Sequence, residues 1–203
     1  MYLNGLCFIT GRKGCCLTLK EIVTFALRAG VRCIQYREKD KARREIYREA
    51  LILRKLTTEF NAIFVVNDHA DIALAVNADG VHLGQSDLPL KEARKVLGKG
   101  KIIGISTHSI EQAIEAEQGG ASYIGFGPIF HTKTKDAGEP KGIKMLKEAK
   151  RHIKIPVIAI GGINAENLQS VIDSGADAVA VSAGIIQGDI ADNAIRFLDI
   201  LKK

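Results

Sequence analysis

Two carboxylate-bearing stretches of the sequence follow apolar, strand-like runs. Asp68 closes the stretch VVND, and Asp87 closes the stretch GVHLGQSD, which also carries His82 and Gln85. Two carboxylates from neighbouring strand ends form a natural Mg2+ site, because Mg2+ takes one or two carboxylates and keeps its other positions for water and phosphate oxygens. The alternative is that these residues cap helices: Asn67 and Asp68 the helix after them, and Asp87 the helix beginning near SDLP.

An amide and two cations follow another apolar run. In CIQYREKD, residues 33–40, the side chains of Gln35, Arg37 and Lys39 alternate, so we expect them to share one side of a strand, with Ile34 and Tyr36 on the other. Two cations beside two carboxylates would complete a cradle for a metal-bound diphosphate. The alternative is that the cations mark a solvated strand exit.

Small residues that suit a phosphate cup follow two later strands. Gly161-Gly162 and Ser182-Ala183-Gly184 can aim backbone N–H groups at an anion, although the glycine pair could instead serve only as a turn. The long loop GPIFHTKTKDAGEPKG adds groups that could close between two ligands: Thr132, Thr134 and Lys135. We expect Glu139 of this loop to face solvent. Together the residues suggest two phosphorylated ligands, one bearing a diphosphate and one a single phosphate.

The elements that must position these residues alternate along the whole chain. We predict strands near residues 3–9, 31–36, 62–66, 79–83, 101–105, 121–125, 155–159 and 177–181. We predict helices near residues 18–29, 40–60, 69–77, 89–97, 109–119, 141–152, 165–174 and 189–202. Such alternation is typical of an α/β fold with parallel strands, and eight units indicate one (β/α)8 TIM barrel over residues 1–203. An open doubly wound sheet is the alternative, but no early GxGxxG supports it.

In such a barrel the active site lies at the C-terminal ends of the strands, and these polar residues follow those ends. Ser106-Thr107-His108 follows the fifth predicted strand, and His108 could instead only begin a helix. His69 and His131 are expected at the surface, and His152 in a structural helix end. No obvious pair of acid and base groups for proton transfer is present.

Composition excludes several classes of protein. The 203 residues carry a net charge of +6, but the cations are scattered and aromatic residues make up only 5%, so no nucleic-acid surface is expected. No apolar run approaches the roughly 20 residues of a membrane span. The four cysteines lack metal-ligand spacing, which favours reduced thiols and a cytoplasmic location. The oligomeric state cannot be read from these features.

Seven blocks, in this order, resemble the thiamine-phosphate synthase (thiamine phosphate pyrophosphorylase) family: QYREK, VVND, GVHLGQSD, GISTHS, GPIFHTKTKDAG, AIGGI and VAVSAGI. The resemblance covers nearly the whole chain. It implies that a hydroxymethylpyrimidine diphosphate loses its diphosphate in a dissociative step that Mg2+ assists. The nitrogen of a thiazole phosphate then bonds to the pyrimidine methylene, which gives thiamine phosphate.

The resemblance also implies roles for individual residues. The residues matching the pyrimidine-diphosphate side are Gln35, Tyr36, Arg37, Glu38, Lys39, Asn67, Ser106 and Lys135. The residues matching the thiazole-phosphate side are Thr132, Lys133, Thr134, Gly162, Ser182 and Ala183. The matching Mg2+ ligands are Asp68 and Asp87, and His108 is a possible auxiliary residue.

Other functions fit parts of the same pattern. A thiazole tautomerase resembles the synthase in fold and in the block around His108, which would shuttle a proton. A phosphosugar isomerase or epimerase would want a carboxylate or histidine pair and has no need of a metal-diphosphate cluster. A phosphate-ligand sensor without catalysis would need a partner surface. Dependence on Mg2+ would separate the synthase from all three.

Overall fold

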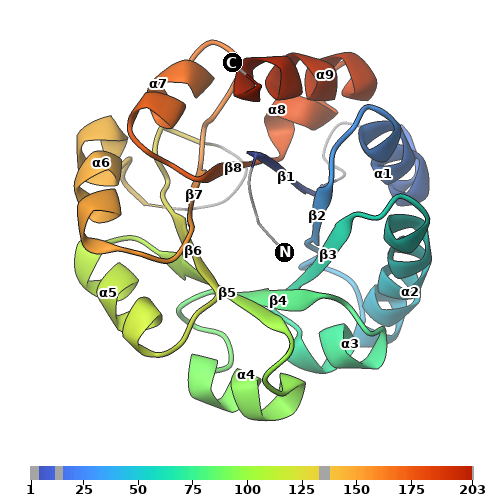
Figure 1. Cartoon of the computed structure of the whole chain (residues 1–203). Helices are drawn as coiled ribbons and strands as arrows, with labels where there is room; N and C mark the ends of the chain where they lie inside the picture. The colour runs from blue at the N-terminus through green and yellow to red at the C-terminus, as the bar shows by residue number, and fades with distance from the viewer. Residues whose placement is uncertain (1–4, 12–15, 133–137, 203) are drawn as a thin grey trace.

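A computed structural model describes residues 5–11, 16–132 and 138–202 of the chain. Eight parallel strands pair in chain order, and the last pairs with the first to close the barrel. Helices surround this barrel on its outer side (Figure 1). The predicted (β/α)8 fold is therefore confirmed.

The elements follow the predicted alternation closely. The strands are β1 (Gly5–Ile9), β2 (Cys33–Tyr36), β3 (Ile63–Asn67), β4 (Gly80–Leu83), β5 (Ile102–Thr107), β6 (Tyr123–Phe126), β7 (Val157–Ile160) and β8 (Ala178–Val181). The helices are α1 (Leu19–Arg28), α2 (Arg43–Glu59), α3 (Ala70–Ala75), α4 (Leu90–Leu97), α5 (Ile110–Gln118), α6 (Gly142–His152), α7 (Leu168–Asp173), α8 (Ala183–Ile186) and α9 (Ile190–Leu201).

Alternating side chains divide the molecule into two cores. Cys7 and Cys33 are register partners on β1 and β2, and their side chains lie inside the barrel with their Sγ atoms 3.3 Å apart. The next residue of β2, Ile34, faces outward into the larger core between the barrel and the helices. This two-residue period therefore decides which side chains of each strand point along the barrel toward its mouth.

Sequence signals at helix ends agree with the structure. Thr18 caps α1 and forms a capping box with Glu21, and Asp189 caps α9 through the backbone N–H of Asp192. These N-terminal caps therefore fix the residue at which each of the two helices begins.

The structure differs from the predicted local structure in two places. The second strand ends at Tyr36, so Arg37 and Lys39 lie in the loop after it instead of alternating with Gln35 along the strand. The short helix α8 was not predicted. Its four residues, AGII, span barely one turn and carry no helical periodicity from which it could be recognised.

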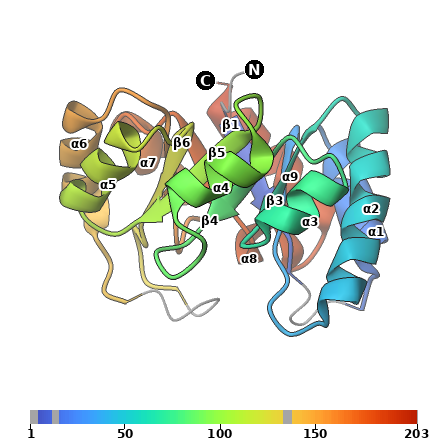
Figure 2. The same cartoon turned by 90° about the horizontal axis from the view of Figure 1, so that it is seen from below.

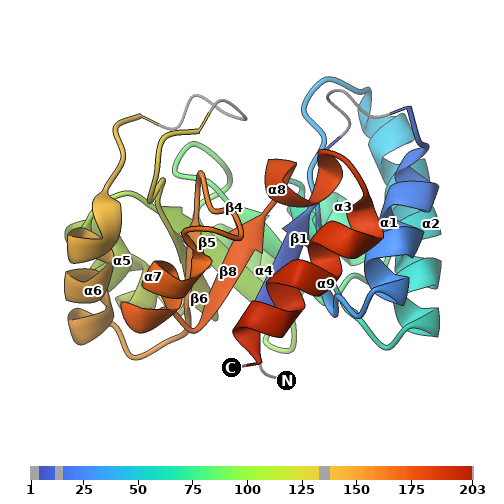
Figure 3. The same ribbon diagram turned by 90° about the horizontal axis from the view of Figure 1, so that it is seen from above.

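The two ends of the barrel differ. Figures 2 and 3 show the C-terminal end of α9 at one end, and the segments that leave β2 and β6 at the other. The C-terminal ends of the strands therefore open onto the loops that carry the candidate site residues. Of the helices in the described ranges, none combines the length and the apolar character needed to cross a bilayer.

Candidate functional site

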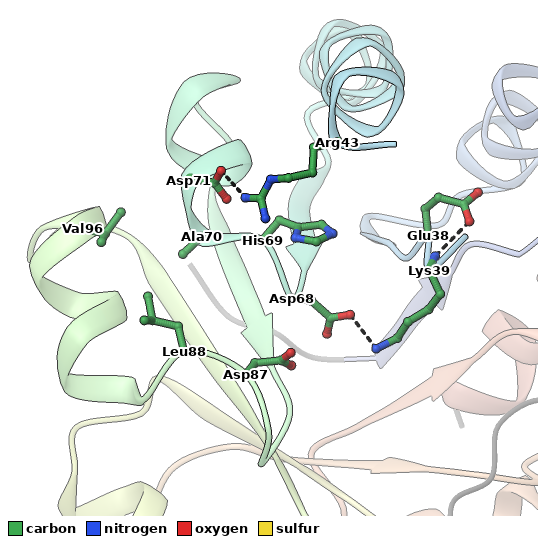
Figure 4. Close-up of a pocket in the computed structure, with 10 residues that line it drawn as sticks. All are labelled: Glu38, Lys39, Arg43, Asp68, His69, Ala70, Asp71, Asp87, Leu88 and Val96. Atoms are coloured by element: carbon green, nitrogen blue, oxygen red, sulfur yellow. Dashed lines mark hydrogen bonds and ion pairs between the residues drawn. The ribbon is translucent and has the colours of Figure 1, made fainter. Parts of the chain in front are cut away.

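A pocket of about 560 Å³ lies where β2, β3 and β4 end (Figure 4). Its lining consists of Glu38, Lys39, Arg43, Asp68, His69, Ala70, Asp71, Asp87, Leu88 and Val96. Figure 4 shows Lys39, Asp68 and Asp87 directed toward one another, and the ion pair of Arg43 with Asp71 farther out. The pocket thus brings together Lys39, Asp68 and Asp87, which the sequence motifs predicted, and adds the pair of Arg43 and Asp71, which they did not.

Asp68 is positioned by an unusual backbone conformation. It has a φ of 68°, in the left-handed region that asparagine and aspartate tolerate better than other side chains. Its backbone N–H still donates to the His82 carbonyl at 2.8 Å, so the ladder between β3 and β4 continues through the turn. The left-handed turn therefore redirects the carboxylate to the pocket without costing a backbone hydrogen bond.

Neither aspartate caps a helix. The N-cap of α3 is His69 and that of α4 is Pro89, and neither helix has a side-chain cap. Asp87 instead accepts a hydrogen bond from the backbone N–H of Gly84 at 2.6 Å, which closes its own loop. The capping alternative is wrong for both residues, and the carboxylates remain directed into the pocket.

The two carboxylates have opposite electrostatic shifts. Burial raises the pKa of Asp68, but hydrogen bonds with Lys39 and Asp87 and the Lys39 charge together hold that pKa below its usual value. Burial is the largest cause that raises the pKa of Asp87; the Gly84 N–H and the Lys39 charge lower that pKa, the neighbouring Asp68 carboxylate raises it, and the pKa remains above its usual value. Bringing a second negative charge beside Asp68 is unfavourable, and a cation between the two carboxylates would remove that cost.

The donor set suits Mg2+. Two carboxylates supply hard oxygen ligands, and no cluster of three or more His, Cys, Asp or Glu side chains converges among residues 5–11, 16–132 and 138–202. A metal held by Asp68 and Asp87 would therefore draw its other ligands from water or from a bound phosphate, which is the usual arrangement for Mg2+.

Amides connect the barrel interior to this pocket. The buried Gln35 donates from Nε2 to Asn67 Oδ1 at 2.7 Å, and Asn67 donates from Nδ2 to Asp68 Oδ1 at 2.5 Å. Lys39 Nζ lies 2.8 Å from the other oxygen of Asp68. Four of the predicted site residues therefore form one continuous chain of hydrogen bonds.

Other residues of the QYREK block lie differently. Tyr36 points outward, and its hydroxyl donates to Glu49 on α2 at 2.7 Å, so the structure does not bring its side chain to the pocket. Glu38 lines the pocket, and its Oε1 accepts the backbone N–H groups of Lys39 and Asp40, which shapes the turn. The backbone N–H of Arg37 donates to Thr10, and the described pocket lining does not include its side chain.

Ser106 and His108 follow β5 but make different contacts. Ser106 Oγ lies 2.9 Å from His82 Nε2, and its carbonyl accepts a hydrogen bond from Gln85 at 2.6 Å. His108 Nδ1 lies 2.6 Å from the Gly127 carbonyl, which can only accept, so this ring nitrogen carries the proton. His108 therefore ties the start of α5 to the end of β6, and it directly precedes the N-cap Ser109.

His82 was given no role from the sequence. A polar side chain at an inward position of the otherwise apolar strand GVHL was the signal that could have identified it.

The predicted phosphate cup lies across the barrel, since β7 and β8 are opposite β3 and β4 in Figure 1. Gly161 and Gly162 have φ values of 98° and 65°. A Cβ at Gly162 would lie 2.5 Å from the His131 carbonyl oxygen, so this glycine permits close approach of the loop after β6. Ser182 and Ala183 begin α8. Thr132 is half-buried, while Lys133, Thr134 and Lys135 lie outside the described residues, and Glu139 is exposed as expected.

Comparison with known proteins agrees with the motifs. A family model described as thiamine monophosphate synthase matches residues 6–185. A thiamine-phosphate synthase of Clostridium acetobutylicum is 49% identical over 186 residues, which are 91% of this chain and 88% of that relative. A thiamine-phosphate synthase of Methanosarcina barkeri is 51% identical over 180 residues, covering 88% of this chain and 81% of that one.

A solved structure gives the same result. Thiamine phosphate pyrophosphorylase from Pyrococcus furiosus superposes with a TM-score of 0.91 at 39% identity, over 98% of this chain and 95% of that one. Sequence and structure together therefore place the chain in the thiamine monophosphate synthase family, a family of transferases.

Proposed function

We propose that the protein couples hydroxymethylpyrimidine diphosphate with thiazole phosphate to give thiamine phosphate and diphosphate. In this reaction the bond between the pyrimidine methylene and the diphosphate oxygen breaks, and the oxygen keeps the electron pair. The lone pair of the thiazole nitrogen forms the new C–N bond. Family membership supports the reaction, and the cluster of Lys39, Asp68 and Asp87 at the strand ends is the observation that supports its diphosphate chemistry.

The chain's own cations would stabilise the departing diphosphate. The Lys39 side chain is about half exposed, and its ammonium group lies at the end of a flexible four-carbon stem. This group can therefore turn from Asp68 to a phosphate oxygen without breaking a backbone contact. Arg37 and Lys135 are proposed to add positive charge on the same side. Positive groups placed where charge develops in the transition state accelerate bond breaking.

Asp68 and Asp87 would hold Mg2+. Bound there, the ion would neutralise negative charge on the diphosphate. The hydrogen bond from Asn67 and the left-handed turn fix the Asp68 carboxylate, while the Gly84 N–H fixes that of Asp87. The two ligands are thus oriented before the substrate arrives, which lowers the entropic cost of assembling the site.

A dissociative course is proposed, through a pyrimidine methylene cation that the thiazole nitrogen captures. Such a course needs little proton transfer, and the chain's polar groups at the pocket are chiefly binding groups. The thiazole phosphate would bind near Thr132, Lys133, Thr134, Gly162, Ser182 and Ala183. A cytoplasmic location with small-molecule substrates completes this proposal.

Product formation tests the proposal directly. Purified protein is mixed with the pyrimidine diphosphate, the thiazole phosphate and Mg2+, and thiamine phosphate is quantified by chromatography. Product that is lost with EDTA and restored by excess Mg2+ is the expected result. Folded protein that binds thiazole phosphate but forms no product would overturn the proposal. The tautomerase or sensor would then be the better account, and conversion of a thiazole isomer would decide between those two.

A further inference from the structure

Three side chains from three neighbouring strands form a hydrogen-bonded series inside the barrel. Tyr123 of β6 places its Oη 2.9 Å from His82 Nδ1, and His82 of β4 places Nε2 2.9 Å from Ser106 Oγ on β5. Tyr123 is 2% exposed and His82 is 6% exposed. The series therefore runs from the closed interior of the barrel to a residue at its mouth.

Glycines on β5 and β6 make room for the two rings. A Cβ at Gly104 would lie 2.1 Å from Cζ of Tyr123, and a Cβ at Gly125 would lie 3.1 Å from Cε1 of His82. Any larger residue at Gly104 would displace the phenol. The arrangement of Tyr123 and His82 is thus specified by four positions of the sequence.

The chemistry of the three groups favours one direction for these hydrogen bonds, in which the phenol donates to the imidazole. Burial raises the pKa of Tyr123 well above its usual value, so the phenol stays protonated. Its buried O–H needs an acceptor, and His82 Nδ1 lies 2.9 Å from it. A neutral imidazole whose Nδ1 accepts must carry its proton on Nε2, and this N–H then donates to Ser106 Oγ.

We propose that His82, oriented by Tyr123, is a positioning residue for Ser106. It holds the Ser106 hydroxyl so that the hydroxyl proton is directed at the pyrimidine diphosphate. Once Oγ accepts from His82, the Ser106 O–H is left to donate to the ligand. This inference rests on the proposed function, because it assigns how one binding group of that site is aligned. A hydroxyl aligned in advance costs no rotamer entropy when charge develops on the leaving group.

The loop after β4 also helps to align Ser106. Gln85 donates to the Ser106 carbonyl, and Asp87, two residues farther on, is a candidate Mg2+ ligand. The segment after β4 therefore sets both the carboxylate and the serine, so their relative position is a property of one short loop.

A double-mutant cycle tests the proposal. Ser106→Ala should lower kcat on the order of 10- to 100-fold, as expected for loss of a hydrogen bond to a charged group. Tyr123→Phe should lower kcat about 5-fold with a smaller effect on KM. In the Ser106→Ala background, Tyr123→Phe should cost less than about 2-fold, because the hydroxyl that it orients is already absent. Equal losses in both backgrounds would show a merely structural role and overturn the proposal.

Two near-isosteric replacements of His82 give a second test. The amide nitrogen of glutamine mimics Nε2 and retains the donor to Ser106, whereas asparagine mimics the Nδ1 side and loses it. His82→Gln should therefore keep several-fold more activity than His82→Asn at equal Tm. The 15N NMR spectrum of the unmodified protein should show the His82 proton on Nε2. A proton on Nδ1, or equal activities of the two variants, would contradict the inference.

The outcomes separate this inference from the proposed function. If the unmodified protein forms no thiamine phosphate, the proposed function fails. If it forms product but Tyr123→Phe is indistinguishable from it, the reaction stands and the positioning role of His82 fails alone.

Discussion

Lys39 Nζ lies 2.8 Å from the Oδ2 of Asp68, although the two residues follow different strands. Lys39 belongs to the loop after β2, and Asp68 to the left-handed turn after β3. The pair thus joins the proposed cation cradle to the proposed metal ligands before any ligand is present. A diphosphate and its metal would compete for these same two side chains, and this competition underlies the first two predictions.

Asp68→Asn should abolish most turnover and leave the fold intact. The amide keeps the shape of the side chain but lacks the charge that a metal requires, so we expect kcat/KM to fall on the order of 100-fold or more. The affinity for Mg2+, measured by calorimetry, should fall together with kcat/KM. Asp71→Asn is the matched control, because Asp71 lines the same pocket but pairs with Arg43 away from Asp87. Undiminished activity of Asp68→Asn would refute its role as a metal ligand.

Lys39→Gln should lower turnover about 10- to 100-fold, through loss of a charged hydrogen bond to the leaving diphosphate. The same change should lower the thermal midpoint only modestly, since Lys39 is half exposed although its partner Asp68 is largely buried. Steady-state kinetics with the diphosphate varied provides the measurement. Lys95→Gln, which breaks only a surface pair with Glu92, is the control. Equal rates for the two variants would remove Lys39 from the site.

His108→Ala should affect stability more than chemistry. The variant loses the hydrogen bond from Nδ1 to the Gly127 carbonyl, which contributes about 0.5–1.5 kcal/mol to the free energy of unfolding. Its turnover should fall less than that of Asp68→Asn. Denaturant unfolding and product assays on the same preparation measure both quantities. Complete loss of synthase activity with an unchanged unfolding midpoint would instead indicate proton transfer by this ring.

Gly104→Ala should destabilise the barrel by about 1–3 kcal/mol, because the new methyl group overlaps the Tyr123 ring. The rings that hold Ser106 should shift with it, so activity should fall even where the protein remains folded. Gly100→Ala is the control, since a Cβ there meets nothing within 4 Å. Thermal unfolding of the two variants gives the comparison, and equal midpoints would show that the interior has spare room.

The barrel itself could be predicted because each strand and helix has its own local signal. Apolar runs such as IFVVN alternate along the chain with helical stretches such as the one after Thr18, and eight such units permit only a few closed arrangements. The element ends were less certain. The four residues of α8 carry too little periodicity to distinguish one helical turn from a loop.

The site could be predicted in part, because its residues follow strand ends that a parallel barrel must bring together. Gln35, Asn67, Asp68 and Lys39 form one connected group in the structure. Tyr36 was included with its neighbours in the motif, yet the two-residue period of β2 turns it to Glu49 on the outer face. The role of His82 depends on its distances to Tyr123 and Ser106, which are 41 and 24 positions away and have no local signature.

The thiols of Cys7 and Cys33 inside the barrel can be used to measure how often the barrel opens. Cys7 and Cys33 are buried, and contact with Cys7 together with burial raises the pKa of Cys33, so this thiol is both shielded and protonated. Alkylating reagents react with exposed thiolates. Cys16 is exposed and should react at once, whereas Cys7 and Cys33 should react only as often as β1 and β2 separate. The labelling rate of this pair therefore measures how often the closed sheet breaks at the seam between its first two strands.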